Sequence, residues 1–366
     1  MQKGTNTTSS DTSYSNKVSE VDNATSSLFN QIFTFENLYN SYLNCIKGVG
    51  WKQTTQAFMF NAWYRIALLY NDLHTGKYKM GDMHFFKVCE RGKTRNISAL
   101  TLRDRIVHKC LCDNYLTNLL SKKLIYDSGA TIKNKGILFA KNRVVAHLQK
   151  YYRHYGNTGY VLKIDFHNYF ESIDHETLMN KLSKVINDDY LLNFIKMLIP
   201  SEVKGLGLGS QISQICAMYY LNEIDHYCKE KLKLKYYARY MDDIYAVHYS
   251  REKLIRVLFI IKSMARKLGV ELNQDKTKII ELEKGFVFCK VKYVLTKTGK
   301  VKKLINARSF RSMKRKIKRG ITFDSVLPSW LSYVSWFNCH KKTYEFINKY
   351  LRNEVNNEQN IIRTLY

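Results

Sequence analysis

The sequence predicts a mixed α+β fold. Its 366 residues are 45% hydrophobic and 13% aromatic, which is enough apolar material to bury a substantial core. Residues 84–98 and 236–247 alternate apolar and polar side chains, a pattern typical of antiparallel hairpins. Longer segments with apolar residues at helical spacing, among them 104–124 and 251–268, lie between these hairpins. Hairpins interleaved with helices predict antiparallel sheets with helices packed against them.

The N-terminal part is predicted to begin with a tail. Residues 1–27 contain twelve Ser or Thr and almost nothing apolar, so we expect them to be disordered. Apolar residues at helical spacing then run from Phe33 to Tyr42 and from Phe58 to Leu69.

The centre alternates strands and helices. Residues 160–165 predict a short apolar strand, and Asp174 is placed to cap a helix that starts at His175. The same patterns predict a helix over 210–231, two strands about a tight turn over 236–247, a hairpin over 287–304, and mostly helix over the last sixty residues.

Charge is the most informative bulk property. Lys and Arg number 59 against 31 Asp and Glu, a formal net charge of +28 with a pI near 9.6. An excess this large attracts polyanions, so nucleic acid is the expected partner. No apolar run is long enough to cross a bilayer and no signal-peptide pattern opens the chain, so we expect a soluble, cytoplasmic protein without a membrane partner. The eight cysteines lack metal-binding spacing and are expected to be reduced thiols.

Acidic residues gather at two predicted strand ends. Asp242 and Asp243 occupy the turn of the 236–247 hairpin, and Asp165 ends the strand at 160–165. Like charges this close repel each other unless a cation neutralises them. Two Mg²⁺ ions about 3.5–4 Å apart, held by carboxylates, stabilise the attacking and leaving oxygens of a phosphoryl displacement. A polar hairpin turn is the alternative for the tip alone, because Asp is a favoured turn residue.

Several motifs resemble those of reverse transcriptases and occur in the same order. They are Asp165 with Phe170 five residues later, Gly209-x-x-x-Ser213-Gln214, Tyr240-Met241-Asp242-Asp243, and segment 272–277. Segments 93–107, 126–136 and 332–336 are similar to fingers and thumb elements of compact bacterial members, a group that includes intron, retron, diversity-generating and defence-associated enzymes. The resemblance implies a right-hand polymerase with fingers, an antiparallel palm and a helical thumb.

The resemblance also divides the chain. It implies a tail at 1–27, an N-terminal extension with fingers at 28–155, a palm at 156–296 that includes a fingers portion at 176–204, and a basic connection with a helical thumb at 297–366. Two positions depart from the family pattern. Gly207 and Leu208 stand where many members have Pro and Gln, and Phe286-Val287-Phe288 lacks the glycine of the usual Phe-Leu-Gly. The second departure leaves the primer-grip geometry open.

By resemblance, Asp165, Asp242 and Asp243 are catalytic metal ligands, with Asp243 ranked third, and the Phe166 carbonyl completes one site. Two Mg²⁺ ions are expected, and Mn²⁺ could replace them. Lys276 is implied as a general acid that protonates the pyrophosphate; solvated surface charge is the alternative for this lysine.

Nucleotide and nucleic-acid contacts are implied as well. The ring of Phe170 would clash with a ribose hydroxyl and so select deoxynucleotides. Lys87 and Arg95 could clamp the triphosphate, although neighbouring basic residues could substitute. Gly209 and Gln211 would approach the nucleotide. From residue 284 to 323 there are fourteen Lys or Arg and no acid, a tract suited to phosphates. The expected nucleic-acid contacts are Ser213, Gln214, Tyr240, Met241, Lys314, Arg315, Lys318 and Arg319.

The expected function is RNA-directed DNA synthesis on a dedicated, structured noncoding RNA. The partners would be dNTPs, a DNA or RNA primer or a protein priming group, and a second copy or an accessory protein. An RNA-making or template-independent polymerase is one alternative, and a non-catalytic RNA-binding module is another. Antiphage defence is the favoured setting, and a diversity-generating retroelement or a retron remains open.

Overall fold

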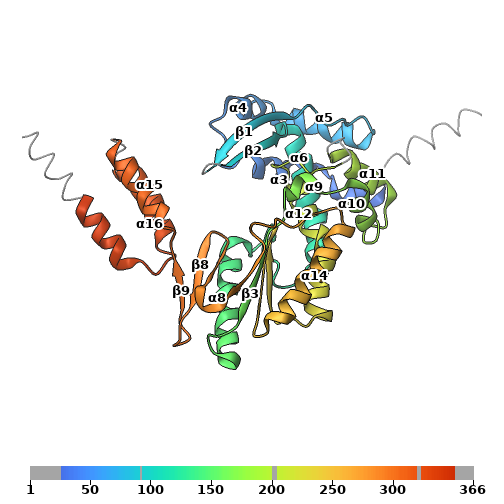
Figure 1. The fold of residues 1–366 in the computed structure, drawn as a ribbon. Coiled ribbons are helices and arrows are strands. Elements are labelled where there is room, and N and C mark those ends of the chain that lie inside the picture. The colour runs from blue at the N-terminus through green and yellow to red at the C-terminus, as the bar shows by residue number, and fades with distance from the viewer. Residues whose placement is uncertain (1–25, 91–92, 200–203, 320–322, 351–366) are drawn as a thin grey trace, which may run out of the picture. The chain divides into compact units, whose positions relative to one another are not determined.

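The computed structural model describes residues 26–90, 93–199, 204–319 and 323–350. Contacts divide the chain into two compact units (Figure 1). The first comprises Met1–Ile125, His167–Asp225 and Met264–Glu271, and the second comprises Tyr126–Phe166, His226–Ser263 and Leu272–Tyr366. Residues 1–25 of the predicted tail lie outside the described residues.

The first unit is mostly helical and carries one two-stranded antiparallel ribbon. Its elements are α2 Ser27–Ile32, α3 Phe35–Ile46, α4 Gln53–Met59, α5 Ala62–His74, β1 His84–Glu90, β2 Lys93–Ala99, α6 Leu102–Leu111, α7 Thr117–Ser121, α9 Tyr169–Ser172, α10 His175–Leu182, α11 Asp189–Leu198, α12 Gln211–Tyr220 and α13 Asn222–His226. The predicted cap of α10 is confirmed, because the Asp174 carboxylate accepts a hydrogen bond from the Thr177 backbone N–H at 2.8 Å.

The second unit contains two antiparallel sheets. One has the strand order β4-β5-β3-β6 and the other β7-β8-β9. The elements are α8 Gly136–Tyr155, β3 Tyr160–Ile164, β4 Tyr236–Tyr240, β5 Asp243–His248, β6 Lys278–Glu281, β7 Phe286–Phe288, β8 Val291–Leu295, β9 Val301–Leu304, α15 Ala307–Lys318 and α16 Phe323–Val334. Helix α14, Arg251–Lys267, begins in the second unit and ends in the first.

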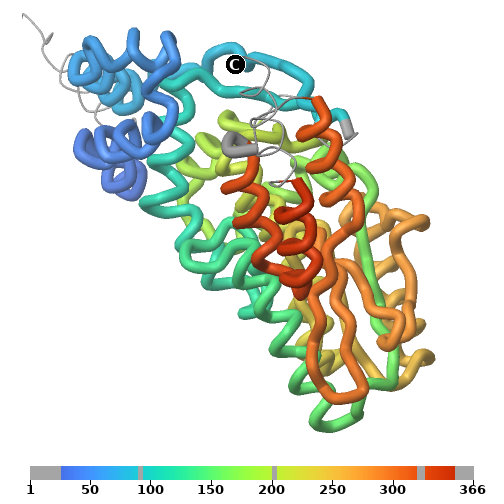
Figure 2. The backbone as a smooth tube through the Cα atoms, turned by 90° about the vertical axis from the view of Figure 1, so that its left-hand side faces the viewer, coloured from blue at the N-terminus to red at the C-terminus, as the bar shows by residue number. Residues whose placement is uncertain are grey.

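One face of the four-stranded sheet forms the core of the second unit. Strand alternation turns Val161, Tyr245 and Val247 to this face, where α8 and the strands β7 and β8 cover them (Figures 1 and 2). The Tyr245 hydroxyl is fully buried there and hydrogen-bonds to Nδ1 of His147 on α8 at 2.8 Å. The core therefore holds the central strands rigidly from one side.

Within the described residues most predicted elements are confirmed, with four differences, and residues 351–366 of the predicted C-terminal helical region lie outside the described residues. The helix predicted over 210–231 is broken at Leu221, between α12 and α13. The helical stretch predicted from Phe33 is interrupted at Thr34, whose hydroxyl caps α3. The stretch through Phe58 and Leu69 is two helices, separated at residues 60–61. The predicted 287–304 hairpin is a three-stranded meander, because Phe286–Phe288 pairs with β8 across a tight turn at Cys289. Within the described ranges, no helix has the length and apolar character needed to span a bilayer.

Candidate active site

The two acidic residues of the β4–β5 hairpin sit at its tip. Tyr240 and Asp243 form the last pair of the ladder, so the loop consists of Met241 and Asp242. Met241 has φ +57°, a left-handed conformation that residues other than glycine adopt at a cost. The guanidinium group of Arg239, which is fully buried, donates a hydrogen bond to the Met241 carbonyl at 3.0 Å. A buried charge thus supports the strained turn.

Strand β3 brings Asp165 beside this tip. The β3–β5 ladder pairs Ile164 with Ile244, so one further step in the same register places Asp165 opposite Asp243. The Asp165 backbone is fixed from its other side, where its carbonyl accepts a hydrogen bond from Asn273 N–H at 2.8 Å. The predicted approach of Asp165 to the hairpin is therefore present in the second unit.

Two lysines neutralise these carboxylates. Lys276 Nζ lies 2.5 Å from Asp165 Oδ2, and Lys163 forms an ion pair with Asp243. The second carboxylate oxygen of Asp243 accepts a hydrogen bond from the Cys289 backbone N–H at 3.3 Å. Lys276 was a predicted site residue, but Lys163 was not. The sequence feature that could have identified Lys163 is its position two residues before Asp165, because this spacing puts both side chains on one face of the strand.

Burial shapes the electrostatics of the cluster. The pKa of Asp242 is raised, first by burial and then by the negative charge of Asp165. Burial also lowers the pKa of Lys163 to about 8, although Asp165 and Asp242 act in the opposite direction. The thiol of Cys289 has a pKa raised to about 12, again mainly by burial. Asp165 and Asp242 are thus close enough to repel each other, which favours a cation between them.

The chemistry of the site fits a divalent metal ion in part. Asp165, Asp242 and the carbonyl of Phe166 offer the hard oxygen donors that Mg²⁺ prefers. Among the residues that the structure describes, however, no three His, Cys, Asp or Glu side chains are arranged to hold one ion together. Asp243 forms an ion pair with Lys163 through Oδ1, and its Oδ2 accepts a hydrogen bond from the Cys289 N–H, while Oδ1 itself has no hydrogen-bond partner within the described part of the chain. The acids are therefore neighbours that an ion would draw together, and lysine ammonium groups now supply the positive charge.

The predicted nucleotide residues of the first unit have varied surroundings. Phe170 lies on the short helix α9, partly buried, and its carbonyl accepts a hydrogen bond from Leu206 N–H at 2.8 Å. Gln211 donates to Asp113 at 2.9 Å. Gly209 has φ +128°, and a Cβ there would stand 3.0 Å from the Ser98 carbonyl oxygen. The close approach of this backbone to β2 therefore favours glycine at position 209, independently of any role in ligand binding.

The two residues predicted to bind the triphosphate lie on opposite faces of the β1–β2 ribbon. In the β1–β2 ribbon, Lys87 pairs with Asn96 and Val88 pairs with Arg95. Paired residues point to the same side and successive residues to opposite sides, so Lys87 and Arg95 lie on opposite faces. Both are exposed. Only one of them can meet a nucleotide held against a single face, and both roles stay predictions.

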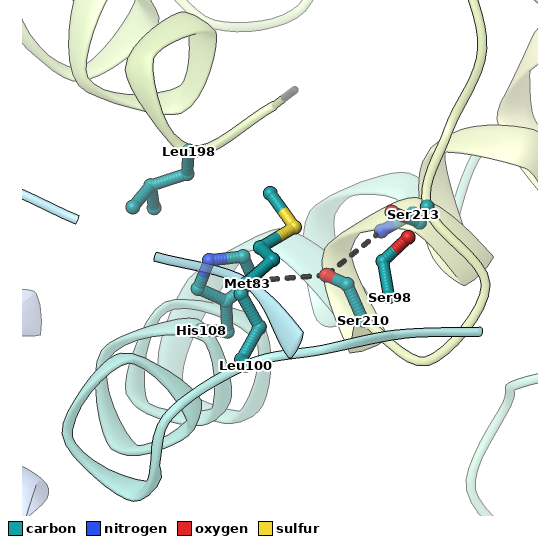
Figure 3. A pocket seen from close by; sticks show the side chains of 8 residues that line it. Met83, Ser98, Leu100, His108, Leu198, Ser210 and Ser213 are labelled. Carbon is teal, nitrogen blue, oxygen red and sulfur yellow. Dashed lines mark hydrogen bonds between the residues drawn. The ribbon is translucent and has the colours of Figure 1, made fainter. Parts of the chain in front are cut away.

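A small cavity in the first unit contains one of the predicted nucleic-acid contacts, Ser213 (Figure 3). Ser213 is buried, whereas Gln214, one residue later on α12, is exposed. His108 lines the same cavity: its Nδ1 hydrogen-bonds to the Ser210 hydroxyl at 2.8 Å, and its buried Nε2 has no hydrogen-bond partner. Burial lowers the pKa of His108 to about 4. Gln214 is therefore the better placed of the two predicted contacts.

The basic tract of the second unit forms an exposed helical surface. On α15, Phe310 and Met313 are buried, and the cationic side chains point outward. All four predicted phosphate contacts are exposed, namely Lys314, Arg315, Lys318 and Arg319. Tyr240 and Met241 at the hairpin are partly buried. Phe337, which follows α16, is buried in the core of the second unit.

Comparison with known proteins decides the family. Residues 79–314 match the family described as reverse transcriptase (RNA-dependent DNA polymerase). The chain belongs to the reverse transcriptase family. The match spans more than half of the chain and includes every predicted catalytic aspartate. Enzymes of this family generally use divalent metal ions, in keeping with the donor set at the β4–β5 tip.

Relatives of this reverse transcriptase chain are distant. It is 22% identical over 222 residues to the "Putative COX1/OXI3 intron 1 protein" of Saccharomyces cerevisiae, a match over 57% of this chain and 25% of that protein. The chain thus spans a quarter of that relative's length.

Similar solved structures include two telomerases. The telomerase from Candida albicans with a TWJ fragment of telomeric RNA has a TM-score of 0.49 at 12% identity, over 75% of this chain and 60% of that one. The apo telomerase from Candida tropicalis, truncated from its C-terminal domain, has a TM-score of 0.47 at 13% identity, over 61% and 55%. The family assignment does not rest on these likenesses.

Proposed function

We propose that the chain is an RNA-directed DNA polymerase that copies a dedicated noncoding RNA into cDNA. The observation that carries this proposal is the meeting of Asp165 and Asp242 in a chain of the reverse transcriptase family. Burial and the nearby negative charge of Asp165 raise the pKa of Asp242, and half-buried carboxylates placed this close together are costly to keep unless they bind cations. The net charge of +28 supports a polyanionic template and product.

In the proposed reaction the 3′-hydroxyl oxygen of the primer attacks the α-phosphorus of a bound dNTP. A new P–O bond forms, the bond to the pyrophosphate oxygen breaks, and the hydroxyl proton passes to solvent water. Lys276, whose ammonium group now contacts Asp165, would give a proton to the leaving pyrophosphate. Arg239 and Lys163 hold the turn and Asp243 in place while this occurs.

Two divalent cations, Mg²⁺ or Mn²⁺, would supply charge neutralisation for the attacking and leaving oxygens. Asp165, Asp242 and the Phe166 carbonyl would hold them, and Asp243 would contribute third. Phe170 would bar ribonucleotides by contact with the 2′-hydroxyl, and Arg95 or Lys87 would bind the triphosphate.

Primer extension with the full chain tests this proposal. We expect labelled dNTPs to be incorporated on an RNA template with an annealed DNA primer, and only with a divalent cation present. Asp242→Ala combined with Asp243→Ala should abolish incorporation. The exposed Asp82, which lies outside the cluster, provides a matched control, and Asp82→Ala should leave the rate unchanged.

The outcomes separate the rival functions. Incorporation by the double variant would refute the assignment of these aspartates. Synthesis without any template would favour a template-independent enzyme, and preference for rNTPs would favour an RNA polymerase. A chain that binds RNA but never extends a primer would be a non-catalytic binding module.

We propose antiphage defence in a bacterial cell as the setting, supported by the Gly209-x-x-x-Ser213-Gln214 form of the α12 motif, which resembles defence-associated lineages. Diversity-generating reverse transcriptases share that form, so they are the second candidate. Sequencing the RNA and cDNA that copurify with the protein distinguishes these settings. A fixed cDNA from an adjacent noncoding RNA supports defence or a retron, and adenine-substituted cDNA of a variable gene supports the second candidate.

A further inference from the structure

The segment from Trp51 to Tyr64, which contains α4 and the start of α5, exposes an unusual number of large aromatic side chains. Trp51 is 75% exposed, Phe60 87%, Trp63 61% and Tyr64 66%. These four residues are called the aromatic face below. Single exposed apolar residues are ordinary, but four large rings within fourteen consecutive positions are a candidate interaction surface. The helices α3 and α4 both pack against α5, so the face belongs to one small helical cluster of the first unit (Figure 1).

The segment that carries the aromatic face is basic, and acidic residues flank it at Glu36 and Asp72. No acidic residue occurs from residue 37 to residue 71, whereas Lys47, Lys52 and Arg65 are exposed in this segment. The ammonium group of Lys52 lies 5.7 Å from the centroid of the Trp51 ring. The other exposed side chains of α4 are mainly uncharged, such as Gln53 and Gln56. The surface thus combines flat rings with positive charge and hydrogen-bonding groups.

One ring of the aromatic face, that of Trp63, is held in place by stacking on its neighbours. Trp63 stacks on Tyr39 at a centroid distance of 4.4 Å and an interplanar angle of 22°, and on Phe35 at 5.3 Å and 18°. Both partners lie on α3, one helical turn apart. A ring fixed in this way loses little conformational entropy when a planar ligand stacks on its exposed part.

We propose that the aromatic face is a docking site for single-stranded RNA, whose unpaired bases stack on Trp51, Phe60, Trp63 and Tyr64 while Lys47, Lys52 and Arg65 contact its phosphates. Nucleobases are planar and each has a π face, so exposed rings bind them with little sequence preference. A duplex keeps its bases stacked on one another and cannot use the face in this way.

Charge decides between RNA and a second copy of this chain. Two copies of a chain with net charge +28 that met through a segment with no acidic residue would place like charges opposite each other. A polyanion meets the same surface with opposite charge. The choice of RNA over single-stranded DNA rests on the proposed function, because an RNA-directed polymerase has a single-stranded RNA template to hold.

Fluorescence and affinity measurements on the full chain test the docking site. The probe is a labelled single-stranded oligoribonucleotide, and its affinity is measured by anisotropy. Trp51→Ala with Phe60→Ala should weaken binding about tenfold or more, the scale on which base stacking contributes. Leu68→Ala removes an exposed apolar side chain of α5 outside the face and should have no effect.

Two further readouts are specific to stacking. RNA should quench tryptophan fluorescence, and Trp51→Phe with Trp63→Phe should remove most of that quenching while affinity is retained. The aromatic variants should leave the slope of log affinity against log salt unchanged, because stacking releases no counterions. Replacing Lys314, Arg315, Lys318 and Arg319 with Gln should instead flatten that slope.

Unchanged RNA affinity in the Trp51→Ala, Phe60→Ala variant, with normal folding by circular dichroism, would overturn the proposal. An equal loss of affinity for duplex RNA would overturn it too, and so would a shift from dimer to monomer in that variant, which would assign the face to a second copy. The Asp242→Ala, Asp243→Ala variant should bind RNA and show quenching normally. Failure of polymerase activity is therefore distinguishable from failure of the docking site.

Discussion

Lys163 and Asp243 form an ion pair between the two central strands of the second unit. Lys163 pairs in register with Tyr245, so Asp243, two residues earlier on the same face, is its diagonal neighbour and within reach of a long side chain. The adjacent acids of the hairpin therefore have different surroundings. Asp243 is bound to the sheet, and Asp242 interacts with Asp165.

We expect Lys163→Met to destabilise the second unit by on the order of 2 kcal/mol, because it leaves a largely buried carboxylate without its cation. The loss is smaller than for a fully buried pair, since 24% of the Asp243 side chain is exposed. Thermal or urea unfolding in EDTA measures it. The combination of Lys163→Met with Asp243→Asn should be more stable than the sum of the single variants predicts. Strictly additive effects would mean that the two side chains do not interact.

Phe170 is predicted to select the sugar. We expect Phe170→Ala to raise the efficiency of rNTP incorporation relative to dNTP by roughly tenfold or more, the scale on which a pocket discriminates against one additional group. Single-nucleotide extension with matched dNTP and rNTP measures the ratio. Tyr169→Phe is the control, because it removes a hydroxyl bonded to the Ala217 carbonyl and keeps the neighbouring ring. An unchanged ratio in Phe170→Ala would make Phe170 an ordinary packing residue.

The lowered pKa of buried His108 predicts that the free energy of unfolding depends on pH. Its pKa is lowered by burial from 6.5 to about 4, so between these values the unfolded chain binds a proton that the folded chain does not. Its contribution to stability is present above pH 6.5 and is lost as the pH falls toward 4, by roughly 3 kcal/mol at most. Urea unfolding should therefore show a shallower decline over this window for His108→Asn. His154→Asn, at an exposed position of α8, should follow the wild-type slope, and identical slopes for all three proteins would contradict the assignment.

The backbone conformation at position 209 is expected to require glycine. Gly209→Ala should lower stability by about 1–3 kcal/mol, because its φ of +128° strains any L residue and the new methyl group would meet the Ser98 carbonyl at 3.0 Å. Thermal unfolding measures the loss. Gly50→Ala is the matched control: a Cβ there meets nothing within 4 Å, and no unusual φ is involved. Equal stability of the two variants would show that the loop before α12 moves freely away from β2.

Local patterns predicted most of the elements, since their signals lie within a few residues. A short apolar run identified β3, alternation identified the β4–β5 hairpin, and a carboxylate at Asp174 identified the start of α10. The sequence does not predict β7 as a separate strand, because Phe286–Phe288 is only three residues long. Its pairing with β8 also depends on a left-handed turn at Cys289 and Lys290, and neither Cys nor Lys favours that backbone conformation.

The sequence predicts that Asp165 approaches the acids of the hairpin tip, but it does not predict the partners of these acids. Asp165 stands out because a charged residue ends an apolar strand, and the order of the motifs that resemble those of reverse transcriptases singles out Asp242 and Asp243. The Lys163–Asp243 pair and the Arg239 bond to Met241 depend on strand register and on which face is buried, and both are properties of the assembled sheet. Likewise, the opposite faces of Lys87 and Arg95 follow from the ribbon register alone.

The bond from buried Arg239 to the Met241 carbonyl has a mechanical consequence. The guanidinium group is enclosed in the sheet, so the loop that carries Asp242 cannot shift without dragging β4 with it. The β4–β5 tip is therefore fixed relative to the sheet. Under the proposed function, the nucleic acid would move one step past a fixed tip in each round of elongation, and a variant with a looser anchor, such as Arg239→Met, should stall between successive additions.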